Sequence, residues 1–314
     1  MTLKAVKPEV VEPGKPKFML SGRAGVGKTL FALDFPKPYL IDTEGGATRP
    51  QYREKLSRVG GVYFGKDHGS QDFAAVIEEI KQLATTSHEY RTLIIDSFSH
   101  LYNTAASIAE EKVGNEFSRD KKEANRPTRQ LMRWLETIDM TVILICHQRE
   151  KWERRGRDVI NTGTTFDGYD KLEYALDLWL EVQKLGQERI VVVKKSRIEG
   201  FPEAKEMPMD YKGFSELYGT SIIERVTAPV ALITPEEVLL IKNLVQVLNI
   251  DKDTVETWFE RAKVDRWEDL TGEQAKKFIA YCDKRLAGIQ PVATPIVEEN
   301  GKTDKAAFVA ARRK

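Results

Sequence analysis

Eight residues near the start of the chain, GRAGVGKT, have the types and spacing of a phosphate-binding loop, G-x-x-x-x-G-K-[ST]. In such a loop, backbone N–H groups surround the β-phosphate of a nucleotide, the lysine neutralises β- and γ-phosphate oxygens, and the last hydroxyl binds Mg²⁺. The loop follows the apolar run KFMLS and precedes the helical run KTLFALDF, as the motif requires. The sequence therefore predicts a site for ATP and Mg²⁺, with an ordinary glycine-rich turn as the alternative. The residues expected to hold the nucleotide are Gly22, Arg23, Ala24, Gly25, Val26, Gly27, Lys28, Thr29 and Leu30.

A carboxylate for the metal ion is expected at the end of another strand. A phosphate-binding loop works with an acidic residue that holds the magnesium ion from a neighbouring strand. The run RTLIIDS supplies Asp96 at such a place, so we expect Thr29 and Asp96 to hold Mg²⁺ together. The alternative is that Asp96 only caps the helix that follows it.

The stretch YLIDTEGG places another carboxylate, Glu44, at the end of the strand after the loop's helix. Hydrolysis needs a base or a water-positioning group near the γ-phosphate, and Ser97 stands where many ATPases carry a second acid. Glu44 can point into the crevice at the carboxyl edge of the sheet, and Gly45 and Gly46 allow a sharp turn there. We therefore expect Glu44 to be catalytic. Alternatively, Glu44 caps a loop and Asp42 is a salt-bridge partner.

These groups need a scaffold that brings several strand ends together. Over residues 17–232, short apolar runs alternate with helical patterns, and in DFAAVIEEIKQLA the apolar side chains fall on one face. Runs that are apolar at every position, alternating with amphipathic helices, are typical of a mainly parallel sheet covered on both sides. The sequence thus predicts an α/β domain whose strands include KFMLS, PYLID, GVYF, TLIID, TVILIC, LDLWLEV and RIVVV.

The pattern becomes purely helical near the C-terminus. Thr234 and Glu237 have the spacing of a capping box, and so do Thr271 and Gln274. Three helices are expected to form a small C-terminal helical domain. The expected organisation is an extended arm over residues 1–16, an ATPase domain over 17–232, a helical domain over 233–288 and a flexible tail over 289–314.

Composition excludes several classes of protein. The 314 residues carry a formal net charge of +1, with 41% hydrophobic and 31% charged residues, so a basic surface has to be local. Cys146 and Cys282 are far apart in the sequence, which suggests neither a disulfide framework nor a zinc site. No apolar run approaches the roughly 20 residues of a membrane-spanning helix. We expect no membrane partner and a cytoplasmic location, in the host cytoplasm if a phage encodes the chain.

The phosphate-binding loop, a glutamate ending the next strand and an aspartate without an acidic successor together resemble the RecA-like ATPases. The stretches IDTEGG and CHQ also make residues 17 to about 227 similar to phage single-strand annealing ATPases of the Sak group, which are nucleotide-binding proteins of AAA type. The resemblance implies a RecA-like P-loop core with a mainly parallel β-sheet flanked by helices. It further implies that Gln148, or His147 beside it, senses the γ-phosphate and signals to a DNA-binding loop.

Two stretches are candidates for contact with single-stranded DNA. The segment of residues 149–177, which follows Gln148, is polar and contains glycines, which indicates a loop of the implied kind. On the helix of RDKKEANRPTRQLMRWLETI, arginines including Arg133 share a side opposite an apolar face. Basic groups neutralise phosphates and an aromatic ring stacks on a base, whereas a merely solvated surface is the alternative for both stretches. The candidate residues are Lys151, Trp152, Arg154, Arg155, Arg157, Arg126 and Arg129.

The run VVVKKSRIEG places Lys195 and Arg197 at the end of a buried strand. In RecA-like rings and filaments, basic residues at this place reach the γ-phosphate of the neighbouring subunit and stabilise the transition-state charge. The resemblance therefore implies that Lys195 and Arg197 are catalytic in trans, within a homo-oligomer. A surface salt bridge is the alternative. The run FVAA near the C-terminus is an F-x-x-A of the type by which some recombinases bind a neighbour.

Three functions are compatible with these features. The first is an ATP- and Mg²⁺-dependent enzyme that oligomerises on single-stranded DNA and promotes annealing or strand exchange. Its helical domain is then expected to recruit DNA or a single-strand-binding protein, with stabilisation of the core as the alternative. The second is a ring helicase motor of the DnaB type. The third is a nucleotide-dependent switch that binds proteins and no DNA, which the near-zero net charge favours.

Overall fold

The computed structural model describes residues 5, 12–113, 119–156 and 158–288, and of residues 112, 113, 119–126, 155 and 288 the backbone only. The chain divides into two compact units, Met1–Pro229 and Val230–Lys314. The first unit contains a sheet with helices, and the second is helical. No helix within the described ranges has both the length and the apolar character needed to cross a membrane.

Nine strands form the sheet of the first unit, in the order β3-β2-β4-β5-β1-β7-β8-β9, with β6 paired to β5. The strands from β3 to β7 in this order are parallel, whereas β8, β9 and β6 pair antiparallel to their neighbours. The mainly parallel sheet predicted from the apolar runs is confirmed. The strands are β1 Lys17–Gly22, β2 Pro38–Asp42, β3 Val62–Phe64, β4 Thr92–Asp96, β5 Thr141–Arg155, β6 Asp158–Phe166, β7 Leu178–Leu185, β8 Glu188–Ser196 and β9 Glu206–Pro208.

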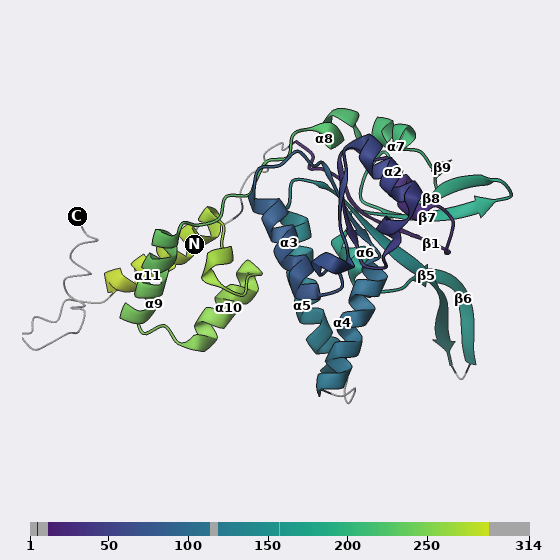
Figure 1. Ribbon diagram of the computed structural model, residues 1–314. Helices are drawn as coiled ribbons and strands as arrows, with labels where there is room; N and C mark the ends of the chain where they lie inside the picture. The colour runs from purple at the N-terminus through teal and green to yellow at the C-terminus, as the bar shows by residue number, and fades with distance from the viewer. Residues whose placement is uncertain (1–4, 6–11, 114–118, 157, 289–314) are drawn as a thin grey trace, which may run out of the picture. The chain divides into compact units, whose positions relative to one another are not determined.

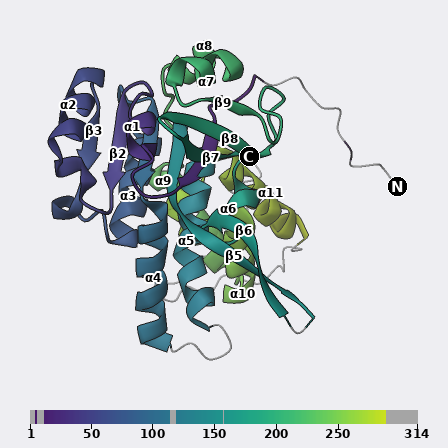
Figure 2. The same ribbon diagram turned by 90° about the vertical axis from the view of Figure 1, so that its right-hand side faces the viewer.

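Helices flank the sheet (Figure 2), and the alternation of side chains along β1 shows why both faces are buried. Phe18 and Leu20 enter one apolar cluster, whereas Met19 between them points to the opposite face and is also fully buried. The helices of the first unit are α1 Lys28–Ala32, α2 Pro50–Val59, α3 Phe73–Thr85, α4 Phe98–Val113, α5 Arg119–Thr137, α6 Leu172–Ala175, α7 Tyr211–Tyr218 and α8 Thr220–Glu224, with 3-10 turns at Gly46–Thr48 and Lys66–His68.

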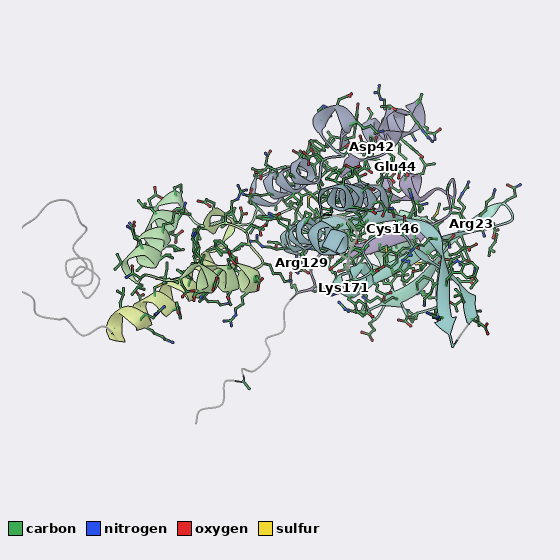
Figure 3. The ribbon with its side chains drawn as sticks, turned by 90° about the horizontal axis from the view of Figure 1, so that it is seen from below. Arg23, Asp42, Glu44, Arg129, Cys146 and Lys171 are labelled. Atoms are coloured by element: carbon green, nitrogen blue, oxygen red, sulfur yellow. The ribbon has the colours of Figure 1, made fainter. Side chains whose placement is uncertain are left out.

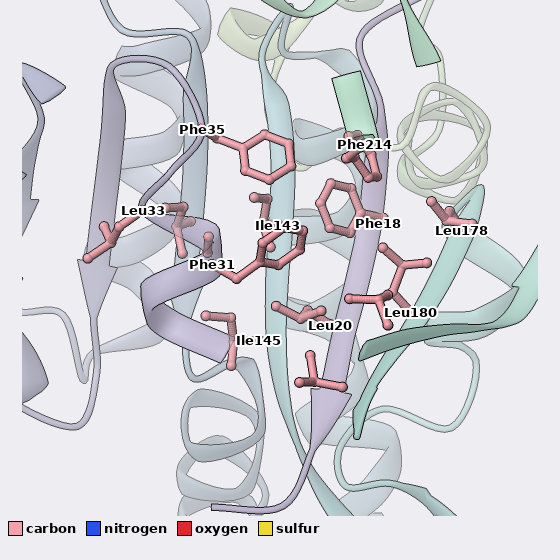
Figure 4. Packing of buried hydrophobic residues seen from close by; sticks show 14 of the residues in the cluster. Phe18, Leu20, Phe31, Leu33, Phe35, Ile143, Ile145, Leu178, Leu180 and Phe214 are labelled. Carbon is pink, nitrogen blue, oxygen red and sulfur yellow. The ribbon is translucent and has the colours of Figure 1, made fainter. Parts of the chain in front are cut away.

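An aromatic cluster fixes α1, and with it the predicted phosphate-binding loop, against β1 (Figure 4). Phe31 of α1 and Phe35 just beyond it are fully buried, with their ring centroids 5.6 Å apart. Phe214 of α7 lies 5.1 Å from Phe18 and 5.2 Å from Phe35. Burial of each such ring contributes about 1.5–3 kcal/mol, so the helix that follows the loop is held in a defined position.

Only part of the segment of residues 149–177 is a loop, although the sequence predicts a long loop over all of it. β5 continues to Arg155 and pairs with β6, with a register shift between Lys151 and Trp152, and the short helix α6 follows. The β-branched residues of DVINTGTTF favour a strand, and pairing satisfies the backbone groups of a polar segment. The prediction of a loop is therefore wrong for most of this segment. Figure 1 shows the β5–β6 hairpin projecting from the sheet.

The basic ridge predicted on α5 is wrong at one position. Arg129 is exposed, but Arg133 is only 5% exposed and its guanidinium lies 4.7 Å from the ring centroid of Trp134. Arginine can cover an apolar ring with its long stem, so Arg133 belongs to the packed side of the helix. The side chain of Arg126 lies outside the described residues.

The second unit contains the helices expected near the C-terminus, α9 Pro235–Val247, α10 Lys252–Ala262 and α11 Gly272–Gly288, with a 3-10 turn at Trp267–Asp269. Both predicted capping boxes are confirmed, with Thr234 and Glu237 exchanging hydrogen bonds of 2.9 and 3.2 Å, and Thr271 and Gln274 bonds of 3.0 and 3.4 Å. Phe278 packs against two tryptophans in the core of the unit. The FVAA run lies outside the described residues.

Candidate nucleotide-binding site

The loop of residues 22–29 connects β1 to α1 with a backbone that requires glycine. Gly25 and Gly27 have φ of 74° and 102°, values that side chains other than hydrogen rarely permit. At Gly22 a Cβ atom would lie 2.7 Å from the carbonyl oxygen of Val182. Lys28 is buried, and its Nζ donates to the carbonyls of Gly22 at 2.8 Å and Arg23 at 2.9 Å. The lysine is thus held inside the loop, where a phosphate would replace these carbonyls as its partner.

The two residues expected to hold the metal ion are in contact. The Oγ1 of Thr29 donates to the Oδ2 of Asp96 over 2.6 Å, although β1 and β4 are separated by β5 in the sheet. Burial raises the pKa of Asp96 to about 6, against the opposing effect of the hydrogen bond from Thr29. A hydroxyl and a carboxylate fit Mg²⁺, which takes few protein ligands and completes its octahedron with water and phosphate oxygens.

Glu44 and Asp42 have different partners at the end of β2. The carboxylate of Asp42 accepts hydrogen bonds of 2.7–3.2 Å from the backbone N–H groups of residues 44–47. Asp42 therefore caps the turn, and Glu44 is not needed for this role. The Oε1 of Glu44 accepts from the Oγ of Ser97, next to Asp96, and from the Nε2 of His147 at 2.8 Å. Figure 3 shows Glu44 beside Asp42, and Cys146, which precedes His147 in β5, is fully buried.

The contact between Glu44 and His147 shifts both titrations. The hydrogen bond from His147 lowers the pKa of Glu44 to about 2, burial opposes this effect, and the bond from Ser97 adds to it. The hydrogen bond to Glu44 raises the pKa of His147 above its ordinary value of 6.5. The contribution of Glu44 to stability is thus lost as the pH falls from 4.5 towards 2. That of His147 is lost as the pH rises through its raised pKa, so the pair is strongest between pH 4.5 and 6.5.

The replacement of Glu44 by glutamine is expected to lower the titration midpoint of His147, because the amide keeps the hydrogen-bonding shape but loses the charge. The chain has four histidines, so two-dimensional NMR of the imidazole groups resolves this change. His68 and His88, which do not contact Glu44, serve as internal references. An unchanged midpoint for His147 would show that the two side chains are not paired in solution.

His147 and Gln148 point in different directions at the end of the buried part of β5. The Nε2 of Gln148 donates to the Oγ1 of Thr164 over 3.0 Å, across the β5–β6 hairpin. His147 instead reaches Glu44, and its backbone N–H donates to the Oγ of Ser99 over 2.9 Å. Of the two candidate γ-phosphate sensors, His147 is the one in contact with Glu44. The contacts of Ser97 and His147 with Glu44 were not foreseen, because they depend on β2, β4 and β5 being neighbours in the sheet.

Lys195 and Arg197 lie at the opposite edge of the sheet from the phosphate-binding loop of their own chain. Ser196 pairs with Leu178, and Leu178 with Phe18 at the start of β1, whereas the loop follows Gly22. The Nζ of Lys195 donates to the carbonyl of Leu176, and the Nη2 of Arg197 donates to that of Tyr174 over 2.7 Å.

The candidate DNA-binding residues occupy two surfaces. Lys151, Trp152 and Arg154 are exposed on the β5–β6 hairpin, where Trp152 is 57% exposed and Lys151 pairs with Glu153 at 2.8 Å. Arg129 lies on α5, among the helices in Figure 3. The side chain of Arg155 and all of Arg157 lie outside the described residues.

A phosphate-binding loop at the carboxyl end of β1, with a carboxylate at the end of β4 in this mainly parallel sheet, is the arrangement of a nucleotide-binding P-loop ATPase. A family described as an AAA domain matches residues 14–202, more than half of the chain. The chain therefore belongs to this family of AAA domains. The crystal structure of the RadB recombinase is similar over 62% of this chain and 86% of that chain, with 21% sequence identity and a TM-score of 0.39. No curated protein matches the sequence.

Proposed function

We propose that this chain is a DNA-dependent ATPase of the phage single-strand annealing type. It oligomerises on single-stranded DNA and promotes annealing or strand exchange. It acts in the cytoplasm, which is the host cytoplasm if a phage encodes the chain. The observation that carries the proposal is the course of β5. This strand brings His147 to Glu44 in the nucleotide site and then continues into the hairpin that exposes Trp152. A change at the γ-phosphate can thus reach the hairpin along one strand.

In this mechanism Glu44 orients the attacking water, and Ser97 and His147 hold the carboxylate until nucleotide binds. Lys28 exchanges the loop carbonyls for phosphate oxygens. Thr29 and Asp96 would hold Mg²⁺, which would neutralise phosphate charge. The transition state of phosphoryl transfer is stabilised mainly by positioning and by positive charge. Movement of His147 away from Glu44 both frees the carboxylate and shifts the base of the hairpin.

The hairpin and the helical unit divide the contacts with partners. Trp152 stacks on bases while Lys151 and Arg154 neutralise phosphates, and Arg155, Arg157, Arg126 and Arg129 extend the basic surface. The helical domain of residues 233–288 recruits DNA or a single-strand-binding protein to the ATPase domain of residues 17–232. In the sequence, the proposed arm of residues 1–16 precedes these domains and the proposed tail of residues 289–314 follows them.

The ATPase rate is expected to rise several-fold on addition of single-stranded DNA, and this stimulation is expected to fade steeply as salt is raised, because phosphate contacts release counterions. Steady-state hydrolysis with and without an oligonucleotide, repeated over a series of salt concentrations, measures both effects. A rate that is indifferent to DNA at low salt would contradict the proposal and favour the protein-binding switch. Unwinding of a forked duplex would instead favour the helicase.

A matched pair of variants connects this stimulation to the hairpin. Trp152→Leu keeps an apolar side chain of moderate size but removes the ring, and it should weaken single-strand binding by the worth of one base stack, about 1–3 kcal/mol. Trp152→Phe keeps a ring and should retain most of the affinity. Equal affinity in both variants would remove stacking by Trp152 from the proposal.

A further inference from the structure

The arginine at the start of β8, Arg189, lies against the phosphate-binding loop of its own chain. A Cβ atom placed on Gly27 would be 3.5 Å from both the Cδ and the Nε of Arg189, and 3.2 Å from the Cε of Met209. Gly27 directly precedes the phosphate-binding Lys28. Although Arg189 and Gly27 are distant in sequence, the arginine thus packs on the loop that holds the nucleotide.

The register of the β7–β8 hairpin explains this position. Val182 of β7 pairs with Gly22 at the end of β1, and the hairpin continues beyond that level until Lys184 pairs with Arg189. Val191 and Val193 are buried in the cluster that also contains Phe31 of α1. Because side chains two residues apart share a face of a strand, Arg189 projects from that same face, at the level where the loop begins.

The guanidinium of Arg189 has no carboxylate partner among the described residues. Two other cations of the β5–β6 and β7–β8 hairpins do have one, since Lys194 pairs with Glu181 at 3.6 Å and Lys151 with Glu153 at 2.8 Å. Arginine presents a planar fork of donors that suits phosphate oxygens. An unpaired arginine on a phosphate-binding loop is therefore a preformed partner for the polyphosphate of a bound nucleotide.

We infer that Arg189 binds a phosphate group of the nucleotide held by its own chain, as a second cation beside Lys28. The inference rests on nucleotide binding at the loop and is independent of the proposed role in DNA annealing. It assigns different tasks to the two ends of β8. Arg189 acts in cis at one end. Lys195 and Arg197 lie at the other end, about 20 Å or more away at 3.3 Å per residue, and do not reach the site of their own chain.

The test is equilibrium binding of fluorescent ATP, ADP and GTP analogues, without DNA, to the full chain and its variants. Arg189→Ala is expected to raise the Kd for ATP and ADP about tenfold to a hundredfold, the range for a lost charge-assisted hydrogen bond. Arg189→Lys should restore part of the affinity, because it returns the charge without the fork. Lys212→Ala removes another exposed cation, on α7, and should leave the Kd unchanged.

Three outcomes would overturn the inference. The first is a Kd for Arg189→Ala within about twofold of the parent chain, in a variant whose circular dichroism and melting temperature are unchanged. The second is a loss confined to adenine nucleotides, which would assign Arg189 to the base. The third is recovery of affinity on mixing Arg189→Ala with Lys28→Ala subunits, which would place the arginine in trans. Absence of DNA stimulation would affect only the annealing proposal.

Discussion

Glu44→Gln is expected to bind ATP with unchanged affinity and to hydrolyse it about 10²–10⁴-fold more slowly, the usual worth of a general base or water-positioning carboxylate. The amide can still accept from the Oγ of Ser97, so the loop after β2, which Asp42 holds through backbone N–H groups, keeps its shape. Only the charge that orients the water is lost. Single-turnover hydrolysis and nucleotide binding, measured on the same preparation, separate the two effects.

The matched control is Glu54→Gln, the same chemical change at a carboxylate that pairs with Arg58 on the exposed side of α2. Its turnover should equal that of the parent chain. A near-normal rate in Glu44→Gln would remove Glu44 from the site. A rise in the Kd for ATP without a change in single-turnover rate would assign the carboxylate to binding instead.

The low pKa of Glu44 narrows its chemical role. A carboxylate with a pKa of about 2 is a weak base at neutral pH, whereas an efficient proton acceptor has a pKa near the working pH. Phosphoryl transfer needs little proton abstraction before its transition state, because that state is largely dissociative. Glu44 is thus better suited to orienting the water than to deprotonating it. Release of the carboxylate from His147 raises its pKa only towards the ordinary value of 4.5, so Glu44 stays a weak base at neutral pH.

The sequence predicted the parts of the fold that have a local cause. The apolar run TVILIC predicted a buried strand, and the helical repeat of Val76, Ile77 and Ile80 predicted a packed helix. Both elements are present, because each depends only on the local pattern of apolar residues. The contact of Thr29 with Asp96 also followed, since parallel strand ends meet at one edge. The β5–β6 hairpin was missed because its polar residues carry no core pattern and only pairing stabilises it.

The parts of the site that remained hidden depend on tertiary register. Nothing around Arg189 in the sequence indicates a phosphate contact, because its position over Gly27 results from where β7 pairs with β1 and where the hairpin turns. The pairing of Glu44 with His147 likewise needs β2, β4 and β5 to be adjacent. Arg133 was predicted on the exposed side of α5 but is buried. The helical repeat indicates which side of the helix a residue lies on, but not whether an arginine stem covers a neighbouring ring.

Arg197→Ala is expected to lose about 10³–10⁵-fold in turnover, the worth of an arginine that stabilises the transition state from a neighbouring subunit, while binding ATP normally. Arg197 would act on a neighbouring subunit because it lies at the end of the sheet where β1 begins. There it donates to the carbonyl of Tyr174 and cannot reach the loop of its own chain. Lys28→Ala should lose turnover because it cannot neutralise the phosphates. The informative measurement is the ATPase rate of the two inactive variants after mixing.

Recovery on mixing follows from geometry. An Arg197→Ala subunit keeps an intact loop, and a Lys28→Ala neighbour supplies the missing arginine, so about a quarter of the interfaces in a random head-to-tail assembly regain all groups. Mixing Arg197→Ala with a chain that carries both substitutions must give no recovery, because no arginine is then available. Normal turnover by Arg197→Ala alone would mean that Arg197 has only a structural role, through its contacts with Tyr174 and Asp177. Recovery would instead make β8 the element that connects the nucleotides of successive subunits, with Arg189 on one and Arg197 on the next.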